Sequence, residues 1–158
     1  MQYIESWRSP GDGPLALFHR QVLSVFYKYA QFDDRAPESG GILLGHARVP
    51  HLELLEATEP SFWDRRMRYF FDRSWRGHRQ IALKRHKESK GLIRYLGEWH
   101  THPEDHPIPS EIDVSGWLRL AREREDGHPV LGVIVGRKSL YLELAYVDGN
   151  RVILSPSI

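Results

Sequence analysis

The sequence predicts a mixed α/β fold in which helices flank a largely antiparallel sheet. Apolar runs of strand length recur along the chain, most clearly at 129–135 and 140–147. Two longer segments, 15–31 and 110–126, carry apolar residues at helical spacing. The two strand candidates are joined by a short turn, Gly136-Arg137-Lys138, and so short a connection indicates an antiparallel pair.

The N-terminal part of the chain is predicted to form a helix. The turn signal Pro10-Gly11-Asp12-Gly13 precedes the segment 15–31, whose apolar residues recur at helical spacing. These residues are Leu17, Val22, Val25, Phe26 and Tyr29. Pro37 then closes the region, because proline does not continue a helix.

A strand pair and a basic segment are expected next. The run 42–44 predicts a buried strand, and 51–57 is its expected antiparallel partner across a turn near Pro50. The segment 62–71 mixes aromatic residues with arginines and is predicted to be a further strand.

The second half of the chain is predicted to alternate helices and strands. Ser74 is the expected N-cap of a helix over 74–89, and Gly91 lies just past its end. The best helix is 110–126, and the three prolines of the loop 103–109 before it prevent regular structure. Strands are expected at 92–102, 129–135, 140–147 and 151–154.

Length and composition narrow the class of protein. The 158 residues contain no internal repeat or linker, so we expect residues 1–158 to form a single domain. Lysine and arginine, 22 in all, balance 21 acidic residues, which disfavours a nucleic-acid binder. The chain has no signal-peptide pattern and no apolar run near the roughly 20 residues that span a bilayer, so a cytoplasmic protein is expected.

The cysteine and histidine counts bear on metal binding. The absence of cysteine excludes disulfides, thiolate zinc fingers, cysteine proteases and His/Cys zinc deaminases. The chain nevertheless has nine histidines. Any metal ligands must therefore be histidine and carboxylate side chains.

One stretch combines such ligands in the pattern H-x-H-x7-S-x2-D, formed by His100, His102, Ser110 and Asp113. Residues i and i+2 of a strand point to the same face with Cα atoms about 7 Å apart, which suits a clamp on one ion. Ser110 and Asp113 lie three positions apart at a helix start, so their side chains share a face. The proline-rich loop can fold this helix end back over the histidine pair.

Two imidazoles and one carboxylate are typical of a catalytic zinc site that keeps its fourth position open for water. Zinc lowers the pKa of bound water to roughly 7. Such a site also needs a donor for the developing oxyanion, which Ser110 can supply, and a carboxylate base that is not a ligand. Glu38 is our candidate base, but spacing alone does not choose it over Glu98, Glu104, Asp105 or Glu111.

These residues together resemble the motif of the JAMM (MPN+) metalloproteases. The similarity rests on Glu38, the glycine-rich strand Gly41-Ile42-Leu43-Leu44-Gly45, His100-x-His102-Pro103 and Ser110-x-x-Asp113. The resemblance implies a JAB/MPN-like fold of cytidine-deaminase-like architecture. It also implies zinc ligation by His100, His102 and Asp113, general acid/base catalysis by Glu38, and stabilisation of the tetrahedral intermediate by Ser110.

Within the family, the phrase Tyr95-Leu96-Gly97-Glu98-Trp99-His100-Thr101-His102-Pro103 is similar to the prokaryotic JAB branch. It resembles in particular the deconjugating peptidases of antiphage CBASS operons and of integrative and conjugative elements. This resemblance implies a zinc-dependent peptidase or isopeptidase, similar to a deubiquitinase. Its partner would be a protein modifier with an extended C-terminal tail, either ubiquitin-like or a conjugated cGAS-like nucleotidyltransferase.

Other interpretations stay open. Ser110-x-x-Asp113 is also a helix capping box, which is compatible with ligation. A RadC-type DNA-associated module has a similar motif, and a non-catalytic MPN-like scaffold is a third hypothesis. His106 lies in the loop over the site and could contact substrate. The arginines of 65–68 fit a solvated strand face, or a site for an extended acidic partner or phosphate. The remaining histidines are expected to be structural or solvated: His19, His46, His51, His78, His86 and His128.

Overall fold

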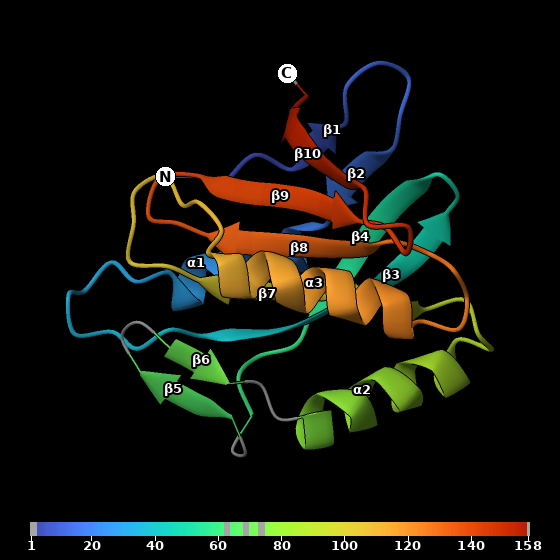
Figure 1. The fold of residues 1–158 in the computed structure, drawn as a ribbon. Coiled ribbons are helices and arrows are strands. Elements are labelled where there is room, and N and C mark those ends of the chain that lie inside the picture. Colours follow the sequence, from blue (N-terminus) through green and yellow to red (C-terminus); the bar gives the residue numbers. More distant parts are fainter. Residues whose placement is uncertain (1–2, 62–63, 68–69, 73–74, 158) are drawn as a thin grey trace.

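A computed structural model of the chain describes residues 3–61, 64–67, 70–72 and 75–157. In these residues a closed barrel forms the centre of a mixed α/β fold (Figure 1). Its strands follow the neighbour order β1 (Ser6–Arg8), β10 (Arg151–Pro156), β9 (Leu140–Ala145), β8 (Val130–Val135), β7 (Arg94–Thr101), β3 (Gly40–Arg48), β4 (His51–Ala57) and β2 (Leu15–Phe18). Most neighbours are antiparallel, and β2–β4 and β7–β8 are parallel. The mixed, largely antiparallel sheet was predicted, but its closure was not.

Helices and a small ribbon surround the barrel. The helices are α1 (Arg20–Tyr29), α2 (Trp75–Glu88) and α3 (Glu111–Glu123), and the ribbon is the antiparallel pair β5 (Arg65–Met67) and β6 (Phe70–Asp72). In Figure 1, α3 lies across the outside of the barrel over β7 and β8, while α2 and the ribbon lie together on one side. None of the helices in the described part of the chain is long and apolar enough to cross a bilayer.

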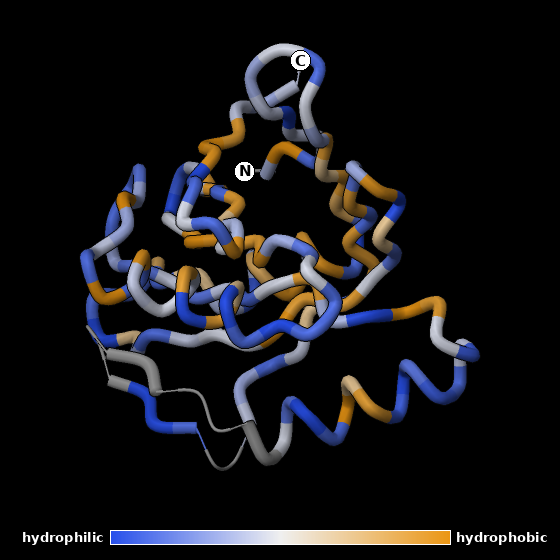
Figure 2. Tube along the Cα trace, turned by 45° about the vertical axis from the view of Figure 1, so that its right-hand side comes forward, coloured by the Kyte–Doolittle hydropathy of each residue, from blue (hydrophilic) through white to orange (hydrophobic). Residues whose placement is uncertain are grey.

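The apolar residues divide into two clusters, one inside the barrel and one beneath α3. Trp99 of β7 is fully buried in the first cluster, where its ring lies 5.4 Å from that of Phe26 on α1. The second cluster packs Trp117 and Ala121 of α3 on Val130 and Ile134 of β8. Figure 2 shows hydrophobic residues concentrated along the barrel strands, whereas α2 is largely hydrophilic. The second cluster fixes α3 against the barrel.

The N-terminal segment corrects the predicted helix over 15–31. Residues Leu15–Phe18 form strand β2, and the helix begins at Arg20. Along β2, Ala16 and Phe18 are buried while Leu15 and Leu17 are exposed, which is the alternation of a strand. The helical spacing was misleading here because Leu17 faces solvent. The short strand β1, which was not predicted, pairs with β2 and β10 and so closes the barrel.

Most other predicted elements are confirmed with small shifts of their ends. The strand pair β3–β4 has the predicted antiparallel arrangement. The segment predicted as one strand over 62–71 instead contains the β5–β6 ribbon, with 62–63 and 68–69 outside the described residues. Gly91 follows α2 with φ +85°, as expected of a glycine at a helix C-terminus, whereas the predicted cap Ser74 lies outside the described residues.

Candidate metal centre

The two histidines of the motif lie at the C-terminal end of β7. Because side chains alternate along a strand, His100 and His102 share one side while Trp99 enters the barrel core. The Nε2 atoms of the two imidazoles are 3.2 Å apart. The strand thus presents two nitrogen donors side by side at the barrel surface.

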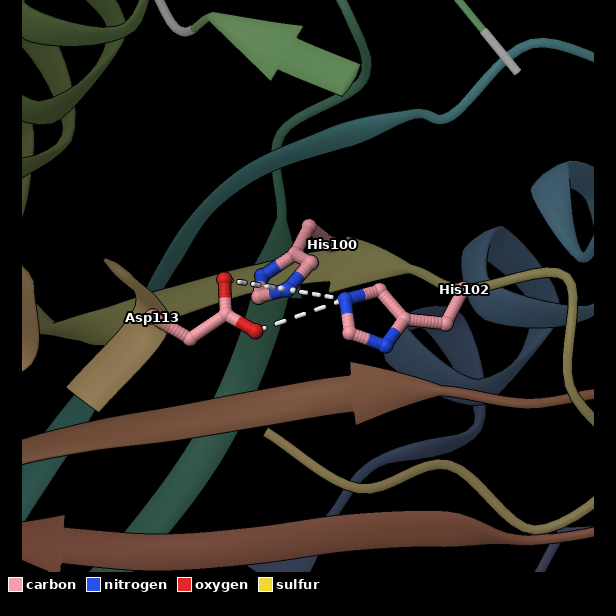
Figure 3. Close-up of side chains that lie close together, drawn as sticks. All are labelled: His100, His102 and Asp113. Carbon is pink, nitrogen blue, oxygen red and sulfur yellow. Dashed lines mark hydrogen bonds and ion pairs between the residues drawn. The ribbon is translucent and has the colours of Figure 1, made fainter. Parts of the chain in front are cut away.

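Asp113 approaches the histidines from the first turn of α3 (Figure 3). Its Oδ1 lies 3.2 Å from His100 Nε2, and its Oδ2 lies 3.4 Å from His102 Nε2. Burial alone would raise the pKa of this carboxyl, but its hydrogen bonds with both imidazoles and with the Ser110 N–H hold the pKa well below the ordinary range. Asp113 is therefore an anionic oxygen donor.

The helix start itself orients Asp113. Ser110 is the N-cap, and its Oγ accepts a hydrogen bond from the Asp113 N–H at 3.1 Å. In return, the Ser110 N–H donates to Asp113 Oδ2 at 2.8 Å. The capping-box interpretation is thus confirmed, and the cap fixes the carboxylate that faces the histidines.

A glycine on β8 lets α3 lie close enough to deliver Asp113. Trp117 is one helical turn after Asp113 and therefore lies on the same face of α3. A Cβ atom built on Gly132 would clash with the indole ring of Trp117. The missing side chain at Gly132 therefore allows the Trp117 ring to seat on the barrel, which brings Asp113 over His100.

The geometry and chemistry of these three side chains fit a zinc ion. Their donor atoms all lie within 4.8 Å of one another. Two ligand atoms of a tetrahedral zinc ion, each about 2.0–2.1 Å from the metal, lie about 3.4 Å apart. The two Nε2 atoms are 3.2 Å apart, and each lies 3.2 or 3.4 Å from one of the two oxygens of Asp113, which is close to this value. The side chains of His100, His102 and Asp113 retain 9%, 13% and 16% exposure, so solvent reaches the centre.

Glu38 reaches the centre through strand pairing. Gly40 pairs with His100, and the Ser39 carbonyl accepts from the Thr101 N–H at 2.8 Å. Ser39 is thus opposite Thr101, and one further step of the antiparallel register places Glu38 beside His102. Burial raises the pKa of Glu38 to about 7, with His102 lowering it and the nearby carboxylates of Asp113 and Glu104 raising it further. Glu38 is thus a buried carboxyl poised near neutrality.

Glu104 makes a contact with His102 that the sequence interpretation missed. Its Oε1 lies 2.8 Å from His102 Nδ1, the ring nitrogen that does not face Asp113. A carboxylate in this position orients a ligand imidazole and fixes its tautomer. Burial lowers the pKa of His102, but hydrogen bonds with Asp113 and Glu104 raise it overall. The only sequence signal for this contact is that Glu104 follows the candidate ligand His102 by two residues. From the sequence alone, Glu104 was considered only as an alternative base.

The loop before α3 is tied to the β8–β9 turn. Asp105 pairs with Arg137 at 3.0 Å and Lys138 at 3.4 Å. Its pKa is lowered, since these hydrogen bonds and charges outweigh burial, and such a paired carboxylate is a poor candidate for the base. His106 is exposed, with its Nδ1 2.9 Å from Ser139 Oγ.

Comparisons with known proteins agree on a family. The model described as prokaryotic homologs of the JAB domain matches residues 19–145. A Pseudomonas aeruginosa protein named "CD-NTase/cGAS isopeptidase" is 46% identical over 156 residues, which is 99% of each chain. Proteins of the same name from Escherichia coli and Vibrio cholerae are each 38% identical, over 77% and 81% of this chain and 76% and 80% of their own lengths.

The fold also matches a solved structure. A Desulfitobacterium hafniense protein, determined in solution, superposes with a TM-score of 0.60 at 19% identity and covers 90% of this chain and 91% of its own. At this identity the likeness concerns the fold alone.

Proposed function

Because the chain belongs to the prokaryotic JAB-domain family, we propose that it is a zinc-dependent isopeptidase. The bond to be cut joins the C-terminus of a protein modifier to its target. The names of the three relatives point to a cGAS-like nucleotidyltransferase as that modifier. The observation that carries the proposal is the convergence of His100, His102 and Asp113 on one point that solvent reaches.

His100, His102 and Asp113 would hold the zinc ion. When bound, zinc acidifies a water molecule and polarises the scissile carbonyl group. The protein side chains then have to move the proton and hold the developing charge.

Glu38 is proposed as the general base and acid. The carboxylate takes a proton from the attacking water and returns it to the leaving amine. Burial raises the pKa of Glu38 to about 7 when no metal ion is bound, and a neighbouring zinc ion would favour the carboxylate form, which is the form that accepts the water proton. Burial beside His102 is what separates Glu38 from an ordinary solvated glutamate.

Ser110 is proposed as the donor to the oxyanion. Its Oγ already accepts the Asp113 N–H, which leaves the hydroxyl hydrogen free to be donated. A donor held in place before the reaction stabilises the tetrahedral intermediate at little reorganisation cost. The capping role and the catalytic role are therefore compatible.

We propose that the extended tail of the substrate lies beside the β5–β6 ribbon. Each described barrel strand has two hydrogen-bonded neighbours, so the barrel offers no free edge. The ribbon has outer edges, and Arg66 of β5 contacts the backbone of Glu38. An extended tail along such an edge would be held by main-chain hydrogen bonds.

The family match and the names of the relatives favour this peptidase over a RadC-type DNA module. The complete His-His-Asp set also disfavours a non-catalytic scaffold.

A conjugate panel tests the proposal. Bacterial cGAS-like nucleotidyltransferases would carry a fluorescent reporter on the C-terminal carboxyl group, joined either by a peptide bond or through a lysine side chain. We expect the zinc-loaded protein to release reporter, a chelator to stop release, and added zinc to restore it. No release from any conjugate, by protein shown to contain zinc, would contradict the proposal.

A further inference from the structure

We propose that Arg66 on the β5–β6 ribbon is a positioning residue for Glu38, an inference that rests on the proposed function. The Arg66 Nη2 donates to Ser39 Oγ at 2.6 Å, and its Nε donates to the Glu38 carbonyl oxygen at 3.3 Å. One guanidinium group thus holds two consecutive residues of the segment that carries the base. Figure 1 shows the ribbon beside the extended segment that leads into β3.

The other side of this segment is held by the ligand strand. The Ser39 N–H donates to Thr101 Oγ1 at 3.0 Å, and the Thr101 N–H donates to the Ser39 carbonyl at 2.8 Å. Thr101 lies between the two histidines, and its hydroxyl also donates to Gln31 Oε1 at 2.9 Å. Thr101, Ser39 and Gln31 are all buried. Glu38 is therefore one residue beyond a rigid buried network, and Arg66 holds it from the ribbon side.

Arg66 is itself oriented by the core. Its guanidinium carbon lies 5.7 Å from the centre of the Tyr29 ring, a cation–π distance. The Tyr29 ring in turn lies 6.0 Å from that of Trp99 inside the barrel. This contact helps to hold the guanidinium where its two donors reach Ser39 Oγ and the Glu38 carbonyl oxygen.

Arginine suits this task better than lysine. The guanidinium offers several N–H donors in a fixed plane, which can reach Ser39 Oγ and the Glu38 carbonyl at once, whereas an ammonium is a point charge. Arg66 is an exposed residue, so replacing it leaves no cavity in the core. The basic segment 65–68 was expected to be a solvated face or a partner site. Arg66 of this segment instead contacts Ser39 and the backbone of Glu38.

The test compares Arg66→Gln and Arg66→Lys with a control, Arg48→Gln. The Arg48 side chain is 63% exposed and pairs with Glu53 across the β3–β4 pair. The Arg48→Gln substitution therefore removes the same positive charge at a different place. Each variant is measured for zinc content, thermal unfolding, kcat and KM on the reporter conjugates, and hydrogen exchange of the Ser39 amide by NMR.

We expect Arg66→Gln to keep zinc and melting temperature, to lower kcat about 10- to 100-fold with KM little changed, and to speed exchange of the Ser39 amide. Arg66→Lys should restore part of kcat, and Arg48→Gln should match the wild type. Wild-type kcat and wild-type Ser39 exchange in Arg66→Gln would overturn the inference and leave the proposed function standing. If the wild type cleaves no conjugate, the proposed function fails, and Ser39 exchange alone decides whether Arg66 holds the segment.

Discussion

Two clusters in this molecule join histidine to aspartate, and they differ in access to solvent. His78 of α2 has Nδ1 2.7 Å from Thr58 Oγ1 and Nε2 2.8 Å from Asp64 Oδ2. The side chains of His78 and Asp64 are both 0% exposed. At the candidate metal centre, by contrast, the three side chains keep some exposure and their donor atoms lie close together.

The difference shows that residue types alone do not identify a catalytic cluster. The hydroxyl, imidazole and carboxylate of Thr58, His78 and Asp64 match those of a hydrolase relay. In this cluster, however, both ring nitrogens are engaged, and the Thr58 hydroxyl is buried and also accepts the Ile42 N–H. The cluster ties α2 and the segment at Asp64 to the end of β4. A candidate catalytic cluster is instead recognised by ligand atoms that converge on one point and remain accessible to solvent.

Replacing a ligand should have the largest effect. His100→Ala removes one of three metal donors, so we expect loss of bound zinc and a fall in cleavage of more than about 10²-fold. Mass spectrometry of the native protein measures the zinc directly. His106→Ala is the matched control, and it should retain one zinc per chain; equal zinc in the two variants would remove His100 from the ligand set.

Breaking the buried cluster should cost stability and leave the chemistry intact. His78→Ala leaves Asp64 buried without its imidazole, so we expect the free energy of unfolding to fall by roughly 3 kcal/mol. Denaturant titration measures this change. Zinc content and kcat of the folded variant should stay at the wild-type level, and loss of zinc with unchanged stability would reverse the assignment of the two clusters.

Glu38→Gln should separate catalysis from metal binding. The amide cannot accept the water proton, so we expect kcat to fall about 10²-fold or more while zinc content stays unchanged. Steady-state cleavage of the reporter conjugates measures the rate. Activity close to that of the wild type would exclude Glu38 as the base.

Glu104→Gln should have a smaller effect, through the orientation of His102. Losing a carboxylate that accepts from a ligand imidazole typically weakens metal affinity about 10-fold or somewhat more. Competition with a fluorescent zinc chelator gives the affinity. Unchanged affinity would show that Glu104 does not orient the ligand.

The last prediction concerns the pH dependence of stability in the metal-free protein. Glu38 has a pKa of about 7 when folded against an ordinary value of 4.5, so the folded state binds more protons between these values. The stability of the metal-free wild type should therefore fall as pH rises from about 4.5 to 7. The pKa of His102 is also raised, so His102 likewise lowers the stability as pH rises. Comparing the wild type with Glu38→Gln isolates the part of the pH dependence that is due to Glu38.

Denaturant unfolding at pH 5 and pH 7.5 measures this slope. Glu38→Gln should flatten it, and so should zinc, because a nearby cation favours the carboxylate form of Glu38. Equal slopes in the wild type and the variant would show that Glu38 is not buried as the structure places it.

Much of the fold could be predicted because most elements have clear local patterns. The antiparallel partner of β3 and the capped helix α3 are examples. Barrel closure could not be predicted, since it depends on β1, which is three residues long, pairing with β10 at the other end of the chain. The strand Leu15–Phe18 was hidden for the same reason, because its pairing partners lie elsewhere in the fold.

The candidate site was also predictable only in part. Spacing alone brought His100, His102, Ser110 and Asp113 together as candidates, whereas Glu38 was preferred only through a family resemblance. The register of β3 and β7 supplies the physical reason for the position of Glu38. The contact of Arg66 with Ser39 joins side chains 27 positions apart, so only the packed structure reveals it.

The central claim is that one zinc ion lies between two imidazoles and an aspartate. A crystal structure of the zinc-loaded protein, with anomalous diffraction recorded on both sides of the zinc absorption edge, tests it most directly. We predict one strong peak about 2.0–2.2 Å from His100 Nε2, His102 Nε2 and an oxygen of Asp113. A zinc peak elsewhere, or no peak between these side chains at full zinc loading, would contradict the account.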